Sequence, residues 1–200
     1  MIAMRRISVA VFVILSLLAL VLVPSREVMA QQFPTSRTAL TLSSAGLNWG
    51  AVYSLGFSVP VAEALDLVGS YHYQSPTGGT NSLYSVGLRY HIPMLSSEYD
   101  LFVGAGYTGV SLGVVTGSFP LTTLRGNASG GSVSAGGSVR LAEAWVGYAS
   151  ASLVSLSGTS GGVYDVGVQY RLAPQVALQA GYINFGGVGG GYGGITVAWR

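Results

Sequence analysis

The sequence predicts an all-β fold, an antiparallel up-and-down transmembrane β-barrel, from three observations. Apolar and small polar residues alternate with a period of two in run after run of the chain, which is the pattern of strands with one apolar face. Only 8% of the 200 residues are charged, although 50% are hydrophobic. Soluble domains carry about 25% charged residues, so neither face of these strands has the composition of an ordinary water-exposed surface.

The first thirty residues stand apart from this pattern and are expected to be a secretory signal peptide. Arg5 and Arg6 precede an apolar run over residues 7–23, and Val28-Met29-Ala30 ends the segment in a small residue. This order of basic, apolar and small-residue parts predicts export and cleavage after Ala30. An uncleaved membrane anchor is the alternative, because the apolar run is just long enough to span a membrane.

Residues 31–200 then make up one domain, the expected β-barrel. After Ala30 the chain contains six arginines and six acidic residues, so its formal charge is near zero. The basic pI of the whole chain therefore arises from the N-terminal segment and gives no argument for nucleic-acid binding. The chain has no cysteine, so it is not a disulfide scaffold, and barrel closure is one other way to hold an exported domain together.

The strands of the first half are the clearest. Between residues 51 and 61 the odd positions are apolar, whereas the even positions include Ser54, Gly56 and Ser58. The same alternation of large apolar residues with Ser, Gly or a charge continues over residues 65–74, 84–92 and 99–108. The polar face consists mainly of very small residues, as a narrow lumen requires, and this favours a barrel over a soluble sandwich.

The second half repeats the pattern over residues 133–141, 164–172 and 195–199. Two segments are less regular. Residues 145–156 fit either phase of the alternation. Val110 and the apolar residues that follow it have the wrong parity for their strand, which predicts a β-bulge or a strand end there.

Ten strands follow from this count, with eight as the alternative if a weak segment stays unpaired. The expected ranges are 38–45, 50–60, 65–74, 82–92, 99–113, 132–141, 144–155, 162–172, 175–185 and 194–200. Short connections near residues 60–63, 93–96, 141–143 and 172–174 alternate with longer Gly-, Ser- and Thr-rich ones at 75–81, 116–131, 157–162 and 186–194. Short periplasmic turns, long outer loops and tyrosines near the strand ends are typical of outer-membrane barrels. The hairpins also look like four versions of one unit.

At the C-terminus the chain reads Gly194-Ile195-Thr196-Val197-Ala198-Trp199. A glycine followed by alternating large apolar residues and a final aromatic resembles the last strand of the small outer-membrane β-barrel superfamily, which includes OmpA-like and OmpX-like barrels. The resemblance is one of pattern over the whole mature chain, and Arg200 departs from it. It implies residence in the outer membrane of a diderm bacterium, contact with its lipid, and recognition of this strand by the barrel-assembly machinery.

The most informative group of residues is the set of charged side chains at strand positions expected to face the lumen. Asp66, Arg89, Asp100 and Arg140 lie near the short-turn ends of four successive strands, and Arg171 continues the series. Unpaired charges are costly in a narrow dry lumen, so these side chains are expected to pair in one acid–base row. Such a row predicts a plug across the lumen, and the alternative is a selectivity ring in a pore.

The remaining candidate chemistry is sparse. Neither His72 nor His91 has a second ligand at metal-binding spacing along the chain, so a structural or lumen-facing role is expected, with no metal and no cofactor. His72 lies near Ser70 on one face, but no residue stands out as the carboxylate of a catalytic trio. We therefore expect a monomeric barrel with a structural or surface-interaction role whose loops meet an extracellular partner. A narrow porin-like channel is the first alternative, and a lipid-modifying enzyme or protease is the second.

Overall fold

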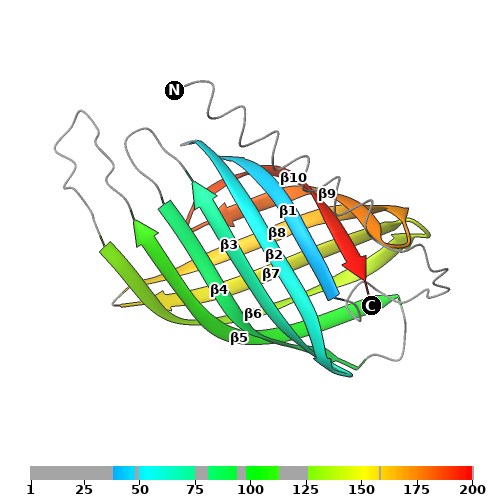
Figure 1. Ribbon diagram of the computed structural model, residues 1–200, viewed down its shortest axis with the longest axis horizontal. Helices are drawn as coiled ribbons and strands as arrows, with labels where there is room; N and C mark the ends of the chain where they lie inside the picture. Colours follow the sequence, from blue (N-terminus) through cyan, green and yellow to red (C-terminus); the bar gives the residue numbers. More distant parts are fainter. Residues whose placement is uncertain are drawn as a thin grey trace. The chain divides into compact units, whose positions relative to one another are not determined.

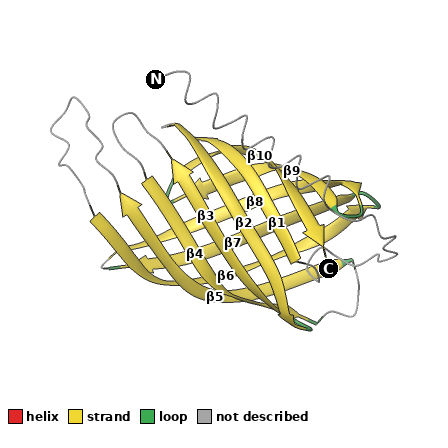
Figure 2. Ribbon diagram, viewed as in Figure 1, coloured by secondary structure: helices red, strands yellow, loops and turns green. Residues whose placement is uncertain are grey.

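The computed structural model describes residues 38–47, 50–74, 81–93, 98–112, 126–157 and 159–199. These residues form ten β-strands that close into one antiparallel up-and-down barrel, as Figures 1 and 2 show. The predicted all-β barrel of ten strands is thereby confirmed over the alternative of eight. The described residues contain no helix long and apolar enough to cross a membrane. The predicted signal peptide and its cleavage site at Ala30 lie outside the described residues, as does Arg200.

Each strand is hydrogen-bonded to its neighbours in the chain, and β1 and β10 close the ring. The strands are β1 (Thr38–Leu47), β2 (Gly50–Ala62), β3 (Leu65–Gln74), β4 (Asn81–Ile92), β5 (Tyr99–Leu112), β6 (Gly126–Ala142), β7 (Trp145–Leu156), β8 (Thr159–Ala173), β9 (Val176–Phe185) and β10 (Val188–Trp199). Inside the barrel the closing seam carries a side-chain hydrogen bond between the hydroxyls of Thr41 and Thr196, at 3.0 Å.

Three strands begin earlier than the alternation predicts. β6 starts at Gly126, β8 at Thr159 and β10 at Val188, so much of the expected loops at 157–162 and 186–194 is strand. Their first residues are Gly- and Ser-rich and show no alternation, yet their backbones pair in register with the neighbouring strands, for example Gly191 with Tyr182. Strand pairing uses only backbone groups, so a long neighbour can extend a strand that has no side-chain pattern of its own.

Of the two possibilities predicted around Val110, the β-bulge does not form, and the strand ends two residues later at Leu112. β5 pairs with β4 and β6 in unbroken register through Val110, which lies opposite Leu83 and Ala128. The strand keeps its parity, and the lumen-facing side changes from polar to apolar at this height. The ambiguous strand β7 has its even positions inward, because Ala149, Ala151 and Leu153 are exposed on the outside.

Three short turns are built alike. The register shifts by one residue between Pro60 and Ala62, between Arg140 and Ala142, and again before Ala173. A β-bulge at this place bends the strand into its turn, and the shared alanine follows a Val or Leu each time. We call this end of the barrel the short-turn end and the other the loop end. The repeated hairpin seen in the sequence thus has a structural counterpart at three of the four short connections.

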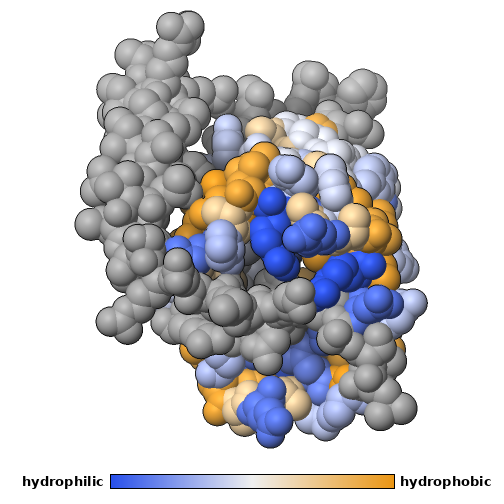
Figure 3. All heavy atoms as spheres, turned by 90° about the vertical axis from the view of Figure 1, so that its right-hand side faces the viewer, coloured by the Kyte–Doolittle hydropathy of each residue, from blue (hydrophilic) through white to orange (hydrophobic). Residues whose placement is uncertain are grey.

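The outside of the barrel is apolar along its length. Large hydrophobic side chains are exposed on most strands, among them Leu55, Leu88, Val103, Leu153 and Val166, at 40%, 48%, 46%, 65% and 55%. Figure 3 looks at the short-turn side of the molecule and shows hydrophilic residues gathered toward the middle with hydrophobic ones at the periphery. The apolar face of every strand therefore points outward, and the face of small polar residues lines the lumen.

Candidate functional site

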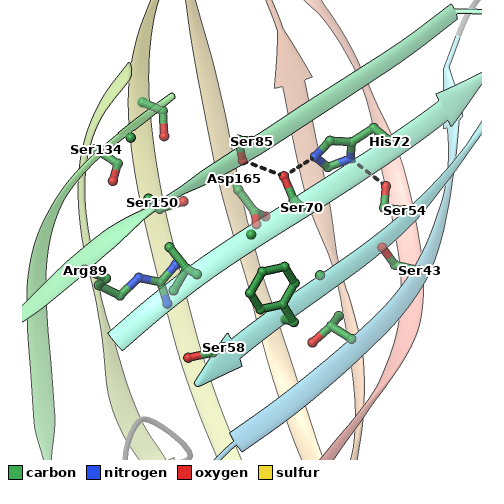
Figure 4. Close-up of a pocket in the computed structure, with 18 of the residues that line it drawn as sticks. Ser43, Ser54, Ser58, Ser70, His72, Ser85, Arg89, Ser134, Ser150 and Asp165 are labelled. Atoms are coloured by element: carbon green, nitrogen blue, oxygen red, sulfur yellow. Dashed lines mark hydrogen bonds between the residues drawn. The ribbon is translucent and has the colours of Figure 1, made fainter. Parts of the chain in front are cut away.

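The lumen encloses a cavity of about 400 Å³, which we call the chamber. Its described lining residues include nine serines and, among charged residues, only Arg89 and Asp165. Several of these side chains are drawn in Figure 4. The serines are Ser43, Ser54, Ser58, Ser70, Ser85, Ser132, Ser134, Ser150 and Ser152. They come from six different strands, because on each strand the inward positions are held by small residues.

Below the chamber, toward the short-turn end, lies a cluster centred on His91. Its Nδ1 is 2.8 Å from Asp100 Oδ1 and its Nε2 is 3.1 Å from Asp66 Oδ2. The same Asp66 oxygen accepts a hydrogen bond from the Ser58 hydroxyl at 2.9 Å. An ionised carboxylate only accepts hydrogen bonds, so both contacts are satisfied at once when His91 is an imidazolium with a proton on each nitrogen.

Arg89 lies beside this cluster without bonding to it directly. It faces Asp66 across the β3–β4 pair, and its charge interacts with Asp66 and Asp100. Its guanidinium lies 4.2 Å from the centre of the Phe102 ring, a cation–π contact that fixes its plane. Its Nε is buried and has no hydrogen-bond partner. We call Asp66, Arg89, His91 and Asp100 the floor cluster; with His91 protonated it has two positive and two negative groups.

The two remaining arginines of the predicted row lie closer to the turns. Asp100 pairs with Ser138, so Arg140 is two residues nearer the short-turn end, and its backbone N–H donates to the Glu98 carbonyl at 2.9 Å. The N–H of Arg171 donates in the same way to the Ala144 carbonyl at 2.8 Å. The structure thus brings Asp66, Arg89 and Asp100 around His91, and it places Arg140 and Arg171 nearer the turns.

A second polar network runs along one wall of the chamber. His72 Nδ1 is 2.8 Å from the Ser54 hydroxyl, and His72 Nε2 is 3.1 Å from the Ser70 hydroxyl. Ser70 in turn bonds Ser85 at 2.9 Å, as the dashed lines in Figure 4 show. An edge contact with the Phe185 ring, at 5.5 Å between centroids, packs the imidazole on its other side. His72 is therefore held by hydroxyls and has no carboxylate among its hydrogen-bond partners.

The facing wall carries Asp165 with two tyrosines. The Tyr192 hydroxyl donates to Asp165 Oδ1 at 2.7 Å and also forms a hydrogen bond with the Tyr148 hydroxyl. Nearby, Gln179 Oε1 accepts from the side chains of Gln169 and Thr196, both at 3.3 Å. These bonds hold one carboxylate and two amides in place on β8 and β9.

Toward the loop end the lumen becomes apolar. The inward positions there hold Leu83, Val110, Val154, Val163 and Ile183, each of intermediate burial. The chamber therefore lies between an apolar layer on the loop side and the charged floor cluster on the short-turn side.

The arrangement offers hydrogen bonding and charge but little else. In the described part of the chain, no group of His, Cys, Asp or Glu could hold a metal ion. His91 does meet two carboxylates in space, which its position in the sequence did not reveal, but both of its nitrogens are occupied by them. The parity of β4 was the available signal, because His91 lies two residues after Arg89 on the same face. Nothing in the sequence singled out Asp165, Tyr148 and Tyr192 as a group.

The predicted assembly strand is the well-formed β10. Gly194 pairs with Gln179, Ile195 with Leu178 and Val197 with Val176. Trp199 is the last residue of the strand and is 38% exposed.

These features define a closed ten-stranded antiparallel barrel with an apolar exterior and a polar interior. No family model matches the chain, and no curated protein matches it. The chain is similar to the N-terminal β-barrel domain of OprF from Pseudomonas aeruginosa, with a TM-score of 0.49, 13% identity, and coverage of 82% of this chain and 98% of that one. It is also similar to the NanC porin, with a TM-score of 0.43, 8% identity, and coverage of 82% and 100%. Neisserial surface protein A gives a TM-score of 0.32, 17% identity, and coverage of 82% and 95%.

Proposed function

We propose that this chain is an integral protein of the outer membrane of a diderm bacterium, with a structural or surface-interaction role and no steady conductance. The membrane location is supported by the apolar exterior of the barrel. Soluble monomers rarely expose contiguous apolar patches of more than a few hundred Å². Here large hydrophobic side chains are exposed on successive strands around the barrel. A closed barrel also satisfies every backbone hydrogen bond within the sheet, as a lipid-embedded chain requires.

The floor cluster carries the proposal of a closed lumen. Asp66 is 2% exposed, and the side chains of His91 and Asp100 are 13% and 12% exposed, so little water reaches these groups. His91 joins Asp66 and Asp100 by short contacts across three strands, and Arg89 lies beside them, so these side chains leave no wide aqueous path beside β3, β4 and β5. Paired charges in a barrel interior are also a device for rigidity, which suits a structural role.

Planar-bilayer recording tests this proposal. The wild-type barrel is expected to give no steady conductance, whereas the double variant Arg89→Ala, Arg140→Ala is expected to conduct, because it removes two long side chains from the short-turn half of the lumen. Ser155→Val is the control, since Ser155 is exposed on the outside of β7 and cannot widen the lumen. A large, stable conductance of the wild type would contradict the closed lumen and support the alternative of a narrow channel. The chamber would then be part of the conducting path.

We also propose that the barrel has no catalytic role. General-base activation of a serine needs a histidine oriented by a third group, usually a carboxylate. Among the described residues, the side-chain hydrogen-bond partners of His72 are the hydroxyls of Ser54 and Ser70, and both nitrogens of His91 contact carboxylates, so neither histidine has one nitrogen on a serine and the other on a carboxylate. Incubation with outer-membrane lipids or with casein, followed by mass spectrometry, is expected to give no product. A product that the wild type makes and His72→Ala does not would contradict this.

A further inference from the structure

The chamber contains polar groups that the protein leaves without partners. In the described part of the chain, the hydroxyls of Ser134 and Ser150 make no hydrogen bond to protein, in contrast to Ser54, Ser70 and Ser85 on the opposite side. Arg89 likewise has a buried Nε with no acceptor. Buried polar groups are nearly always hydrogen-bonded in native proteins, so the Arg89 Nε needs a partner, and the two serine hydroxyls are accessible to one inside the chamber.

The unpartnered groups are close together. Arg89 pairs with Gly104, and Gly104 pairs with Ser134, so only a glycine separates the arginine from the serine along the wall. Phe102, on which the guanidinium stacks, pairs with Gly136, and Gly136 pairs with Ser150. The two glycines leave the wall flat between these side chains. Figure 4 shows Arg89, Ser134 and Ser150 on one side of the cavity.

The chamber is much larger than a single ion or water molecule. About 400 Å³ falls within the range of small-molecule sites, which is roughly 300–1,000 Å³, whereas a water takes about 30 Å³ of liquid. Val52, Ile183 and Phe185 add an apolar part to the lining.

The charge of the lining decides the kind of solute. Among the residues that the structure describes, Arg89 and Asp165 are the only charged ones that line the chamber, and their charges cancel. A solute with a net charge would lose its hydration without gaining a net opposite charge, which is costly. Hydroxyl groups, in contrast, find both donors and acceptors in serine, glutamine, arginine and aspartate side chains.

We propose that the chamber is a binding site for a small uncharged polyhydroxylated solute of monosaccharide size, recognised by Arg89, Ser134 and Ser150. The carbohydrate hydroxyls accept hydrogen bonds from the guanidinium and exchange them with the two serines, while Asp165 accepts from the far side. This site depends on the barrel fold alone, so it stands or falls independently of the proposed membrane location and of the conductance.

The test uses the mature barrel refolded in detergent micelles. Folding of every variant is checked by heat modifiability, the difference in gel mobility between heated and unheated samples. Saturation-transfer NMR and calorimetry measure binding of glucose, glucuronate and glucosamine, which are neutral, anionic and cationic probes of one shape. Glucose is expected to bind at least tenfold more tightly than either charged probe. The double variant Ser134→Val, Ser150→Val is expected to weaken glucose binding about 25-fold, because it removes two hydrogen bonds that are each worth about fivefold in affinity.

The matched control is Ser155→Val, the same substitution on the outer face of β7, and it is expected to leave glucose affinity unchanged. Three results would overturn the proposal: no glucose binding by the folded barrel, equal binding by the double variant and the wild type, or tighter binding of a charged probe. A folded barrel that conducts ions but still binds glucose with these variant effects would overturn the closed lumen and leave the binding site standing.

Discussion

At the scale of single residues, the interior of this barrel depends on His91. Its imidazole contacts two carboxylates, one of which also accepts a hydrogen bond from Ser58. Histidine can do this because a ring with a proton on each nitrogen has two donors pointing in nearly opposite directions. An arginine side chain is longer and carries its donors on one planar group. In this barrel Arg89 stacks on Phe102, and no direct hydrogen bond joins it to Asp66 or Asp100.

Replacing His91 with leucine is expected to destabilise the folded barrel by about 3 kcal/mol, because breaking a buried ion pair leaves an uncompensated charge. Asp66 Oδ2 would keep the Ser58 bond and lose the imidazole, and Asp100 would lose its closest cation. Urea-induced unfolding in lipid vesicles, followed by tryptophan fluorescence, measures the change. The double variant His91→Leu, Asp100→Asn is expected to recover part of the loss. If the single and double variants lose equal stability, the charge of Asp100 has no part in the effect.

At the scale of elements, glycine sets how closely neighbouring strands and side chains approach on β6. A Cβ added at Gly136 would lie 2.6 Å from the Ala149 carbonyl oxygen and 2.6 Å from the Phe102 ring. A Cβ at Gly131, on the same strand but facing outward, would meet nothing closer than 4.0 Å. The interior glycines are thus a requirement of the narrow lumen, whereas this exterior one is not.

Gly136→Ala is therefore expected to cost about 1–3 kcal/mol of stability, the usual range for overpacking, and to disturb the Arg89–Phe102 stacking. Gly131→Ala on the same strand is the control and is expected to change stability by less than about 0.5 kcal/mol. Both are measured by urea unfolding in the same vesicles. Comparable losses for the two alanines would mean that strand propensity, and not the close approach inside the barrel, controls β6.

The last strand carries a separate prediction about assembly. Trp199 ends β10 and is 38% exposed, in the position where the family resemblance places a recognised aromatic. Trp199→Ser is expected to reduce assembled barrel in cells several-fold, whereas deletion of Arg200 changes it little. Heat-modified mobility of membrane fractions gives the assembled amount, and total protein by immunoblot corrects for expression. Wild-type assembly of the Trp199 variant would remove this strand from recognition by the assembly machinery.

At the scale of the whole molecule, closure of the sheet separates an outer surface suited to lipid from a lumen suited to water. Strands β2 to β10 each expose at least one large apolar side chain on the outside, and small polar residues make up much of the lumen lining, so the barrel has an apolar surface suited to lipid and a lumen suited to water and polar solutes. A ten-stranded interior is narrow, since eight strands give one that side chains just fill. One charged cluster and one apolar layer are therefore enough to bound the chamber along the axis.

This arrangement and the signal-peptide pattern of residues 1–30 together predict the location of the protein and the first residue of its mature form. The mature chain is expected in the outer-membrane fraction after carbonate washing, and its N-terminal sequence is expected to start at Gln31. The carbonate wash distinguishes an integral barrel from a peripheral protein, and a cytoplasmic-membrane marker controls the fractionation. Recovery as a soluble periplasmic protein would contradict the membrane location, and an intact N-terminus would support the uncleaved anchor.

The sequence by itself determined the strand-forming segments, their number and the two faces of the barrel, because a period of two is a local property of the chain. It also placed Asp66, Arg89 and Asp100 on the inward face. It did not reveal that β6, β8 and β10 begin earlier, because glycine-rich backbone pairs without leaving a side-chain signal. The tertiary structure alone decided which inward groups meet. His91 joins Asp66 and Asp100, and Tyr192 joins Asp165 and Tyr148, across strands whose relative register and stagger only closure of the barrel fixes.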